Sequence, residues 1–160
     1  MQPIFITFRP VEENNSESLS MVELLDKKIF DNPWNAMQWK TEVANLANKV
    51  LFICFSKDRA EEIGKYTVAG FASYGICGDE IELKKIGVLS QYRNKSIGLR
   101  ALENIIFLVK KEGFHKMVLE VSENNYPALQ LYSHLKFQKI GIRKKYYSNL
   151  FNAIVMQKIF

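Results

Sequence analysis

The chain has 160 residues, of which 48% are hydrophobic and 24% are charged, so we expect an ordinary globular protein with a single domain over residues 1–160. It contains no apolar run near the roughly 20 residues that a membrane-spanning helix needs, and its first residues lack the layout of a secretory signal. The net charge of +5 is carried by scattered lysines without interleaved aromatic residues, which argues against a nucleic-acid-binding segment. We therefore expect a cytoplasmic protein with neither a membrane nor nucleic acid as its partner.

The apolar periodicity predicts a chain in which strands and helices alternate. Strands are predicted at residues 4–8, 50–55, 66–76, 81–88, 116–121, 137–143 and 152–158. Helices are predicted around residues 19–29, 35–47, 97–112 and from 124 onward. Residues 57–65 are predicted to form a charged loop, and Tyr146 and Tyr147 a loop between the last two strands. This order predicts a mixed α/β sheet, and Cys54 and Cys77 are expected to be buried free thiols without a metal.

The strand at 81–88 passes into the helix at 97–112 through a basic and polar turn, Arg93-Asn94-Lys95-Ser96-Ile97-Gly98. Several backbone N–H groups at the start of a helix, together with two cationic side chains, suit a phosphate or a pyrophosphate. The same composition also fits a solvated connection that binds nothing, so the turn by itself leaves both interpretations open.

Three stretches resemble the GCN5-related N-acetyltransferases, the GNAT family. The turn resembles the family's cofactor turn (Arg or Gln, two residues, Gly, one residue, Gly or Ala), with Ser96 in place of the first glycine. Residues 119–121 resemble the Leu-Glu-Val strand of bacterial ribosomal-protein alanine acetyltransferases, and residues 124–132 resemble the family's Ser-Asn-x-x-Ala-x-x-x-Tyr stretch. The resemblance covers nearly the whole chain. It implies the acyl-CoA N-acyltransferase fold, with a mixed central sheet of about seven strands and about four helices, and acetyl-CoA as co-substrate.

The resemblance also implies which residues hold acetyl-CoA. The backbone at 86–88 would bind the pantetheine arm and the thioester carbonyl, the turn would bind the phosphates, and Asn125 would bond the pantetheine amide. The implied cofactor-binding residues are Ile86, Gly87, Val88, Arg93, Asn94, Lys95, Ser96, Ile97, Gly98, Asn125 and Tyr132. Taken alone, Gly87 also fits an incidental glycine in a buried strand.

Acetyl transfer from a thioester to an amine requires a base for the amine and an acid for the leaving thiolate. On the resemblance, Glu120 is the base, acting through a water, and Tyr132 protonates the thiolate. Glu82 is a second candidate, at the position where eukaryotic relatives have a tyrosine that relays the proton. From the residues alone, Glu120 also fits a solvated sheet face and Tyr132 a core aromatic residue.

Two segments resemble those of protein N-terminal acetyltransferases. Phe30, Pro33 and Trp34 lie where the family has its acceptor loop, and Tyr146 and Tyr147 follow a basic pair in the last hairpin. Two tyrosines facing an aromatic loop would cover an extended peptide and leave its α-amine at the thioester, although Trp34 and one tyrosine also fit simple packing at the end of the sheet. The implied reaction is acetylation of a protein or peptide N-terminus, and a ribosome-associated partner subunit is one of the implied partners. Residues 86–93 and 144–147 resemble the eukaryotic enzyme that acetylates N-termini starting with methionine, whereas residues 119–121 resemble the bacterial alanine enzyme, and both branches stay open.

Two alternatives remain at this point. The same fold acetylates lysine side chains or small amines in other relatives, and a domain with a degenerate cofactor site would only bind a partner protein. Ser96 and Lys136, which replace family glycines, favour the second alternative.

Overall fold

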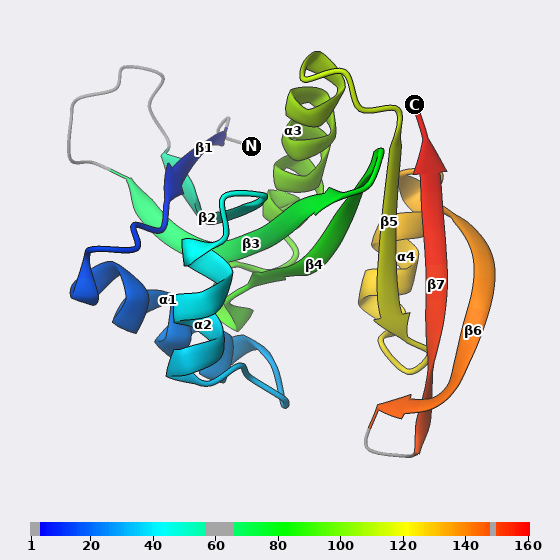
Figure 1. Ribbon diagram of the computed structural model, residues 1–160, viewed down its shortest axis with the longest axis horizontal. Helices are drawn as coiled ribbons and strands as arrows, with labels where there is room; N and C mark the ends of the chain where they lie inside the picture. Colours follow the sequence, from blue (N-terminus) through cyan, green and yellow to red (C-terminus); the bar gives the residue numbers. More distant parts are fainter. Residues whose placement is uncertain (1–3, 57–65, 148–149) are drawn as a thin grey trace. The chain divides into compact units, whose positions relative to one another are not determined.

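The structure, a computed structural model, describes residues 4–56, 66–147 and 150–160 (Figure 1). The predicted loop at 57–65 lies outside these ranges. Within them the chain forms seven strands, four α-helices and one 3-10 helix. The strands are β1 (Phe5–Pro10), β2 (Asn48–Ser56), β3 (Thr67–Cys77), β4 (Glu80–Val88), β5 (Lys116–Ser122), β6 (Gln138–Tyr147) and β7 (Phe151–Ile159). The helices are α1 (Ser16–Ile29), α2 (Ala36–Ala44), the 3-10 helix η1 (Ser90–Tyr92), α3 (Ile97–Lys111) and α4 (Tyr126–His134).

The strands form one mixed sheet in the order β1-β2-β3-β4-β5-β7-β6. The pairs β1–β2, β5–β7 and β6–β7 are antiparallel, whereas β4 and β5 are parallel, with Ile81 opposite Met117 and Leu83 opposite Leu119. This confirms the predicted α/β fold and the predicted order of its elements. The prediction that Tyr146 and Tyr147 belong to a loop was wrong, because β6 continues through both residues.

The chain divides into two compact units. The first consists of Met1–Tyr74 with Lys85–Leu102, and the second of Gly75–Lys84 with Glu103–Phe160. In the first unit α1 and α2 contact each other, and α2 contacts β2 (Figure 1). A buried hydrophobic cluster joins these elements to β3, and it includes Val22, Leu25, Trp39, Phe52 and Phe71.

In the second unit, β5 has one buried and one partly exposed face. Met117, Leu119 and Val121 are buried, whereas the side chains at 118, 120 and 122 are only partly covered. This alternation follows from the two-residue period of a strand. Glu120 therefore belongs to the more open face of β5.

Helix starts follow side-chain caps. Asn35 caps α2 as predicted, and with Gln38 it forms a reciprocal capping box. α1 begins at Ser16, three residues before the predicted start, because the side chain of Asn15 accepts a hydrogen bond from the N–H of Ser18 at 3.0 Å. A single asparagine within a polar stretch was too weak a signal to place that start.

The α4 helix ends without the family's glycine. Lys136 adopts a left-handed conformation (φ 65°), its N–H donates to the Ser133 carbonyl at 3.0 Å, and the N–H of Phe137 donates to the Tyr132 carbonyl at 2.9 Å. These are the two hydrogen bonds of a Schellman motif, so a lysine performs the cap that glycine usually forms.

We expect Lys136→Gly to stabilise the protein by about 1 kcal/mol, because the left-handed conformation is costly for a residue with a Cβ and not for glycine. Chemical denaturation would measure the change in the free energy of unfolding. Lys139→Gly, in strand β6, is the matched control and should destabilise the protein. A loss of stability in Lys136→Gly would contradict this account of the cap.

The two cysteines differ. Cys54 is buried, and burial raises the pKa of its thiol to about 11 despite the nearby charge of Arg9. Cys77 is exposed, so the prediction that both thiols are buried was wrong for this residue, which is the last of β3 before the turn at Gly78.

Among the described residues, no helix combines the length and apolar character needed to cross a membrane, and no three His, Cys, Asp or Glu side chains are grouped as for a metal ion.

Candidate functional site

The turn before α3 has the backbone of an anion site. Asn94 and Ser96 both adopt left-handed conformations, with φ of 59° and 58°. The carbonyl of Ser96 accepts the N–H of Arg100 at 3.0 Å, which starts the helical hydrogen-bond pattern. Within the described residues, the N–H groups of residues 94–99 donate to no protein acceptor. These groups are therefore available to phosphate oxygens at the positive end of the α3 dipole.

The side chains of the turn add positive charge. Arg93 and Lys95 are exposed, and the Nε of Arg93 donates to the Val88 carbonyl at 3.0 Å, which ties the guanidinium to the end of β4. Ile97 is buried, so it contributes only its backbone N–H. A Cβ built at Gly98 would lie 3.6 Å from Val88, which is ordinary contact. The residues of the turn thus fit a pyrophosphate.

Gly87, near the end of β4, is a point of close approach. A Cβ there would lie 2.4 Å from Cγ2 of Ile29 and 2.8 Å from Cε2 of Phe30, and a Cβ at Gly70 in β3 would lie 1.9 Å from the Gly87 carbonyl oxygen. Real Cβ atoms do not approach this closely. Gly87 therefore allows the C-terminal end of α1 to pack directly on the strand expected to bind the thioester arm.

We expect Gly87→Ala to destabilise the protein by about 1–3 kcal/mol, because the new methyl group must displace the β-branched Ile29 and the ring of Phe30. Thermal and chemical denaturation would measure the loss. Gly98→Ala is the matched control, since its methyl group has room and lies in the first turn of a helix. Equal stability of the two variants would contradict the close approach at Gly87.

Phe30, Pro33 and Trp34, the predicted acceptor-loop residues, follow α1 directly. Phe30 and Trp34 are half-buried, and Pro33 is exposed. The N–H of Phe30 donates to the Asp26 carbonyl at 2.9 Å, and the N–H of Trp34 donates to the Asp26 carboxylate at 2.8 Å. The structure thus places these three residues in one short loop anchored at both ends on Asp26.

Asp26 itself was missed by sequence reasoning. It is fully buried and forms an ion pair with Lys85 of β4, at 2.7 and 2.8 Å from the two carboxylate oxygens. A signal was present, since Asp26 lies on the apolar face of α1, one residue after Leu25 and four after Val22. An acid at such a position calls for a buried partner, but the sequence does not identify which lysine.

In the second unit, Glu120 is paired with a cation. Its Oε1 lies 2.7 Å from Nη1 of Arg143, and its side chain is 28% exposed. The hydrogen bond to Glu120 raises the pKa of Arg143 above its ordinary value. The guanidinium carbon also lies 4.2 Å from the centre of the Tyr146 ring. The structure therefore brings together Glu120 and Tyr146, two of the predicted site residues, through an arginine that sequence reasoning did not select.

Glu82, the second candidate base, is exposed and lies opposite Val118 in the parallel β4–β5 pair. Since Val118 and Glu120 are two residues apart on β5, Glu82 shares the face of Glu120. The described contacts give Glu82 no ion pair comparable to that of Glu120.

Asn125 and Tyr132 belong to α4. Asn125 is the N-cap, and its side-chain oxygen accepts the N–H of Ala128 at 3.3 Å, so the amide NH2 is the part of this side chain that suits a cofactor carbonyl. Tyr132 is buried, with its ring centre 5.7 Å from that of Phe137. This packing is what a core aromatic residue would show, and it would equally hold the ring in place if Tyr132 served as a proton donor.

Tyr146 is exposed, and the backbone of Tyr147 pairs with Phe151 at the end of β6. The side chain of Tyr147 lies outside the described part of the molecule.

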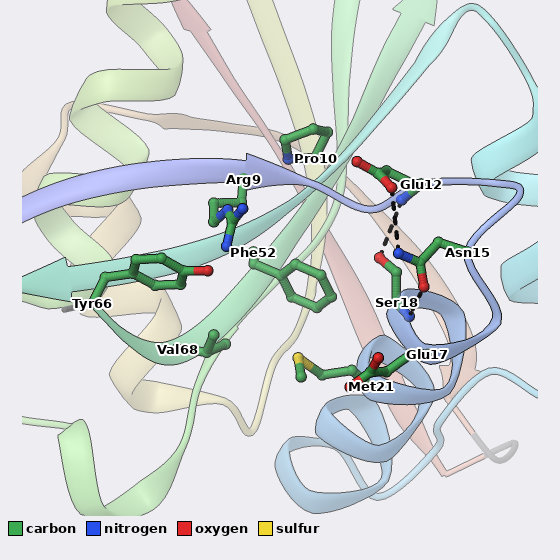
Figure 2. Close-up of a pocket in the computed structure, with 10 residues that line it drawn as sticks. All are labelled: Arg9, Pro10, Glu12, Asn15, Glu17, Ser18, Met21, Phe52, Tyr66 and Val68. Atoms are coloured by element: carbon green, nitrogen blue, oxygen red, sulfur yellow. Dashed lines mark hydrogen bonds between the residues drawn. The ribbon is translucent and has the colours of Figure 1, made fainter. Parts of the chain in front are cut away.

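A separate pocket of about 260 Å³ lies at the start of α1, between Arg9, Phe52 and Tyr66 (Figure 2). Its polar residues Glu12, Asn15 and Ser18 hydrogen-bond to one another, and it contains none of the predicted site residues.

The chain is similar to known acetyltransferases. The profile of the family described as "Acetyltransferase (GNAT) family" matches residues 19–137. The ribosomal protein bS18-alanine N-acetyltransferase of Escherichia coli is 29% identical over 139 residues, which span 84% of this chain and 87% of that protein.

Solved structures agree on the fold. The crystal structure of the ribosomal-protein-S18-alanine N-acetyltransferase from Escherichia coli has a TM-score of 0.79 at 23% identity, covering 97% of this chain and 94% of that one. The structure of Arabidopsis thaliana NAA60 in complex with acetyl-CoA has a TM-score of 0.80 at 16% identity, covering 98% of this chain and 100% of that one.

Proposed function

Because this chain belongs to the acetyltransferase (GNAT) family and is an N-acetyltransferase, we propose that it transfers the acetyl group of acetyl-CoA to the free α-amine of a protein or peptide N-terminus. The observation that carries the cofactor assignment is the row of available N–H groups at residues 94–99, next to Arg93 and Lys95. The acceptor assignment is supported by relatives that are named ribosomal protein bS18-alanine N-acetyltransferases. The proposed place of action is the cytoplasm, with neither a membrane nor nucleic acid as partner.

The residues proposed to hold acetyl-CoA are the backbone of 86–88, the turn at 93–98 and the amide of Asn125. The cofactor supplies an activated acetyl thioester. The N–H groups of the turn bind phosphate oxygens, and Arg93 and Lys95 offset their charge. The cation of Lys95 lies 5.7 Å from the ring of Tyr92, which supports its side chain beside the turn.

The proposed proton transfers use two side chains of the second unit. Glu120 accepts the proton of the acceptor amine through a water, and its ion pair with Arg143 at 2.7 Å holds the carboxylate in place on the open face of β5. Tyr132 donates a proton to the leaving thiolate. Glu82, on the same sheet face as Glu120, is the alternative base.

The proposed peptide contacts are Phe30, Pro33 and Trp34 of the loop after α1, and Tyr146 and Tyr147 at the end of β6. An α-amine has a pKa about 2.5 units below that of a lysine side chain, so a modest carboxylate base suffices for it. An alanine-starting N-terminus is the first acceptor to test.

The test is acetyl-CoA turnover with peptides that begin with alanine, serine or methionine, beside a peptide with a blocked N-terminus and a free lysine. We expect turnover of free N-termini, with alanine preferred, and none of the blocked peptide. Turnover of the blocked peptide alone would show that the acceptor is a lysine side chain and not an N-terminus. Binding of acetyl-CoA without turnover of any peptide would instead favour a small-amine acceptor or a binding domain.

A further inference from the structure

Asp26 and Lys85 form a buried ion pair inside the first unit. Asp26 is fully buried and the side chain of Lys85 is 10% exposed, with Nζ at 2.7 and 2.8 Å from the two carboxylate oxygens. Burial lowers the pKa of Lys85 below its ordinary value, and the hydrogen bonds to Asp26 oppose that shift. The pair links the last turn of α1 to β4, immediately before Ile86.

Aromatic rings enclose the lysine. Its Nζ lies 4.8 Å from the ring centre of Phe30, 4.8 Å from that of Trp34 and 6.0 Å from that of Trp39. The Trp39 indole N–H donates to the same carboxylate at 3.1 Å. Two of the three rings, those of Phe30 and Trp34, belong to the loop proposed to contact the acceptor. The ammonium group therefore makes cation–π contacts with both aromatic side chains of that loop.

The pair also fastens the backbone of that loop. The N–H of Trp34 donates to the Asp26 carboxylate at 2.8 Å, and the Asn32 carbonyl lies 3.5 Å from the Lys85 ammonium. At the other end, Phe30 packs on Gly87, two residues beyond Lys85. Through Lys85 and Gly87 the loop is therefore connected to residues 85–87 of β4, which overlap the stretch 86–88 proposed to hold the thioester arm.

A buried ion pair is a poor way to gain stability, because the cost of removing two charges from water offsets much of their attraction, and apolar residues of similar volume often serve as well. The hydrogen bonds to Trp34 and Asn32 give this pair a directional role that an apolar contact would not have. We propose that Asp26 and Lys85 are positioning residues that set the acceptor loop against β4, and that they thereby control acceptor binding. This inference rests on the proposed N-terminal acetyltransferase function.

The test compares Lys85→Met with the double variant Asp26→Asn/Lys85→Met. In Lys85→Met a buried carboxylate loses its partner, so both the thermal midpoint and acceptor binding should suffer. The double variant removes both charges and keeps an acceptor for the Trp34 N–H. We expect it to recover most of the lost thermal midpoint, while its KM for an alanine-starting peptide stays at least about tenfold above wild type and its KM for acetyl-CoA changes less than about threefold.

The matched control is Lys27→Met, which removes an exposed ion pair with Glu23 on the same helix and should leave both KM values unchanged. Recovery of the peptide KM together with the thermal midpoint in the double variant would overturn the proposal, because the pair would then serve stability alone. An unchanged peptide KM in folded Lys85→Met would also overturn it.

Failure of the proposed function has a different signature, namely a wild-type enzyme that does not turn over any free N-terminus. In that case the KM of the variants is measured with whichever amine the wild type does acetylate. The positioning role can also be tested without any acceptor, because Trp34 and Trp39 are the chain's two tryptophans and their fluorescence reports on the loop. Acrylamide quenching of their fluorescence should rise at least about twofold in the double variant as the loop loosens, and unchanged quenching would contradict the proposal.

Discussion

Replacing Glu120 by Gln should lower turnover of an N-terminal peptide at least about 100-fold, the lower end of what a positioned general base contributes. Gln keeps the shape of the side chain, and Arg143 is exposed enough to be solvated without its partner. We therefore expect the dissociation constant for acetyl-CoA to stay within about twofold of wild type. Steady-state kinetics and calorimetric titration of the cofactor would separate these two quantities.

Glu82→Gln is the matched control for this prediction, because it removes another carboxylate from the same face of the sheet. If Glu120 is the base, Glu82→Gln should retain turnover within about tenfold of wild type, which allows for a secondary relay role. A 100-fold loss in Glu82→Gln with little change in Glu120→Gln would transfer the base to Glu82. Unchanged turnover in both variants would remove both carboxylates from the mechanism.

Replacing Tyr132 by Phe should also lower turnover at least about 100-fold, because the variant lacks the hydroxyl that is proposed to protonate the leaving thiolate. The ring stays packed against Phe137, so the fold should be retained and acetyl-CoA should still bind. Single-turnover kinetics would place the defect in the chemical step, and the thermal midpoint would confirm that the core is intact.

Tyr146→Phe is the matched control, since this tyrosine is exposed and is proposed to contact the peptide. We expect it to raise the KM for the peptide with a much smaller effect on turnover at saturation. Wild-type turnover in Tyr132→Phe would assign Tyr132 to the core, as its burial and its packing on Phe137 alone would suggest.

Sequence periodicity was sufficient for a mixed α/β sheet and the order of its elements, whereas the acyltransferase fold was implied by the resemblance to the family. β5 alternates buried and partly exposed residues, and Asn35, the predicted cap, does cap α2. The errors fell where local signals are weak. The start of α1 depends on Asn15, and the end of β6 depends on cross-strand pairing with β7, which no local pattern encodes.

In the candidate site, too, features set by neighbouring residues were predictable from the sequence, and contacts between distant residues were not. The turn at 93–98 was predictable because a helix start can be read from neighbouring residues, and the structure adds that Asn94 and Ser96 adopt left-handed conformations there. Partners distant in sequence were not predictable. Lys85 is 59 residues from Asp26, and Arg143 is 23 residues from Glu120, so only the folded chain identifies these ion pairs.

The irregular register of β6 has a consequence for how the molecule meets other molecules. β6 ends the sheet and carries Ile140 and Ile142 at 51% and 48% exposure, and an open edge of this kind is a template for pairing with another chain. The register shifts between Lys139 and Gly141, and again between Arg143 and Tyr147, with Lys145 in a left-handed conformation. A straight strand from another molecule would therefore meet only short regular stretches of backbone, flanked by lysines, and this edge opposes the growth of intermolecular sheets.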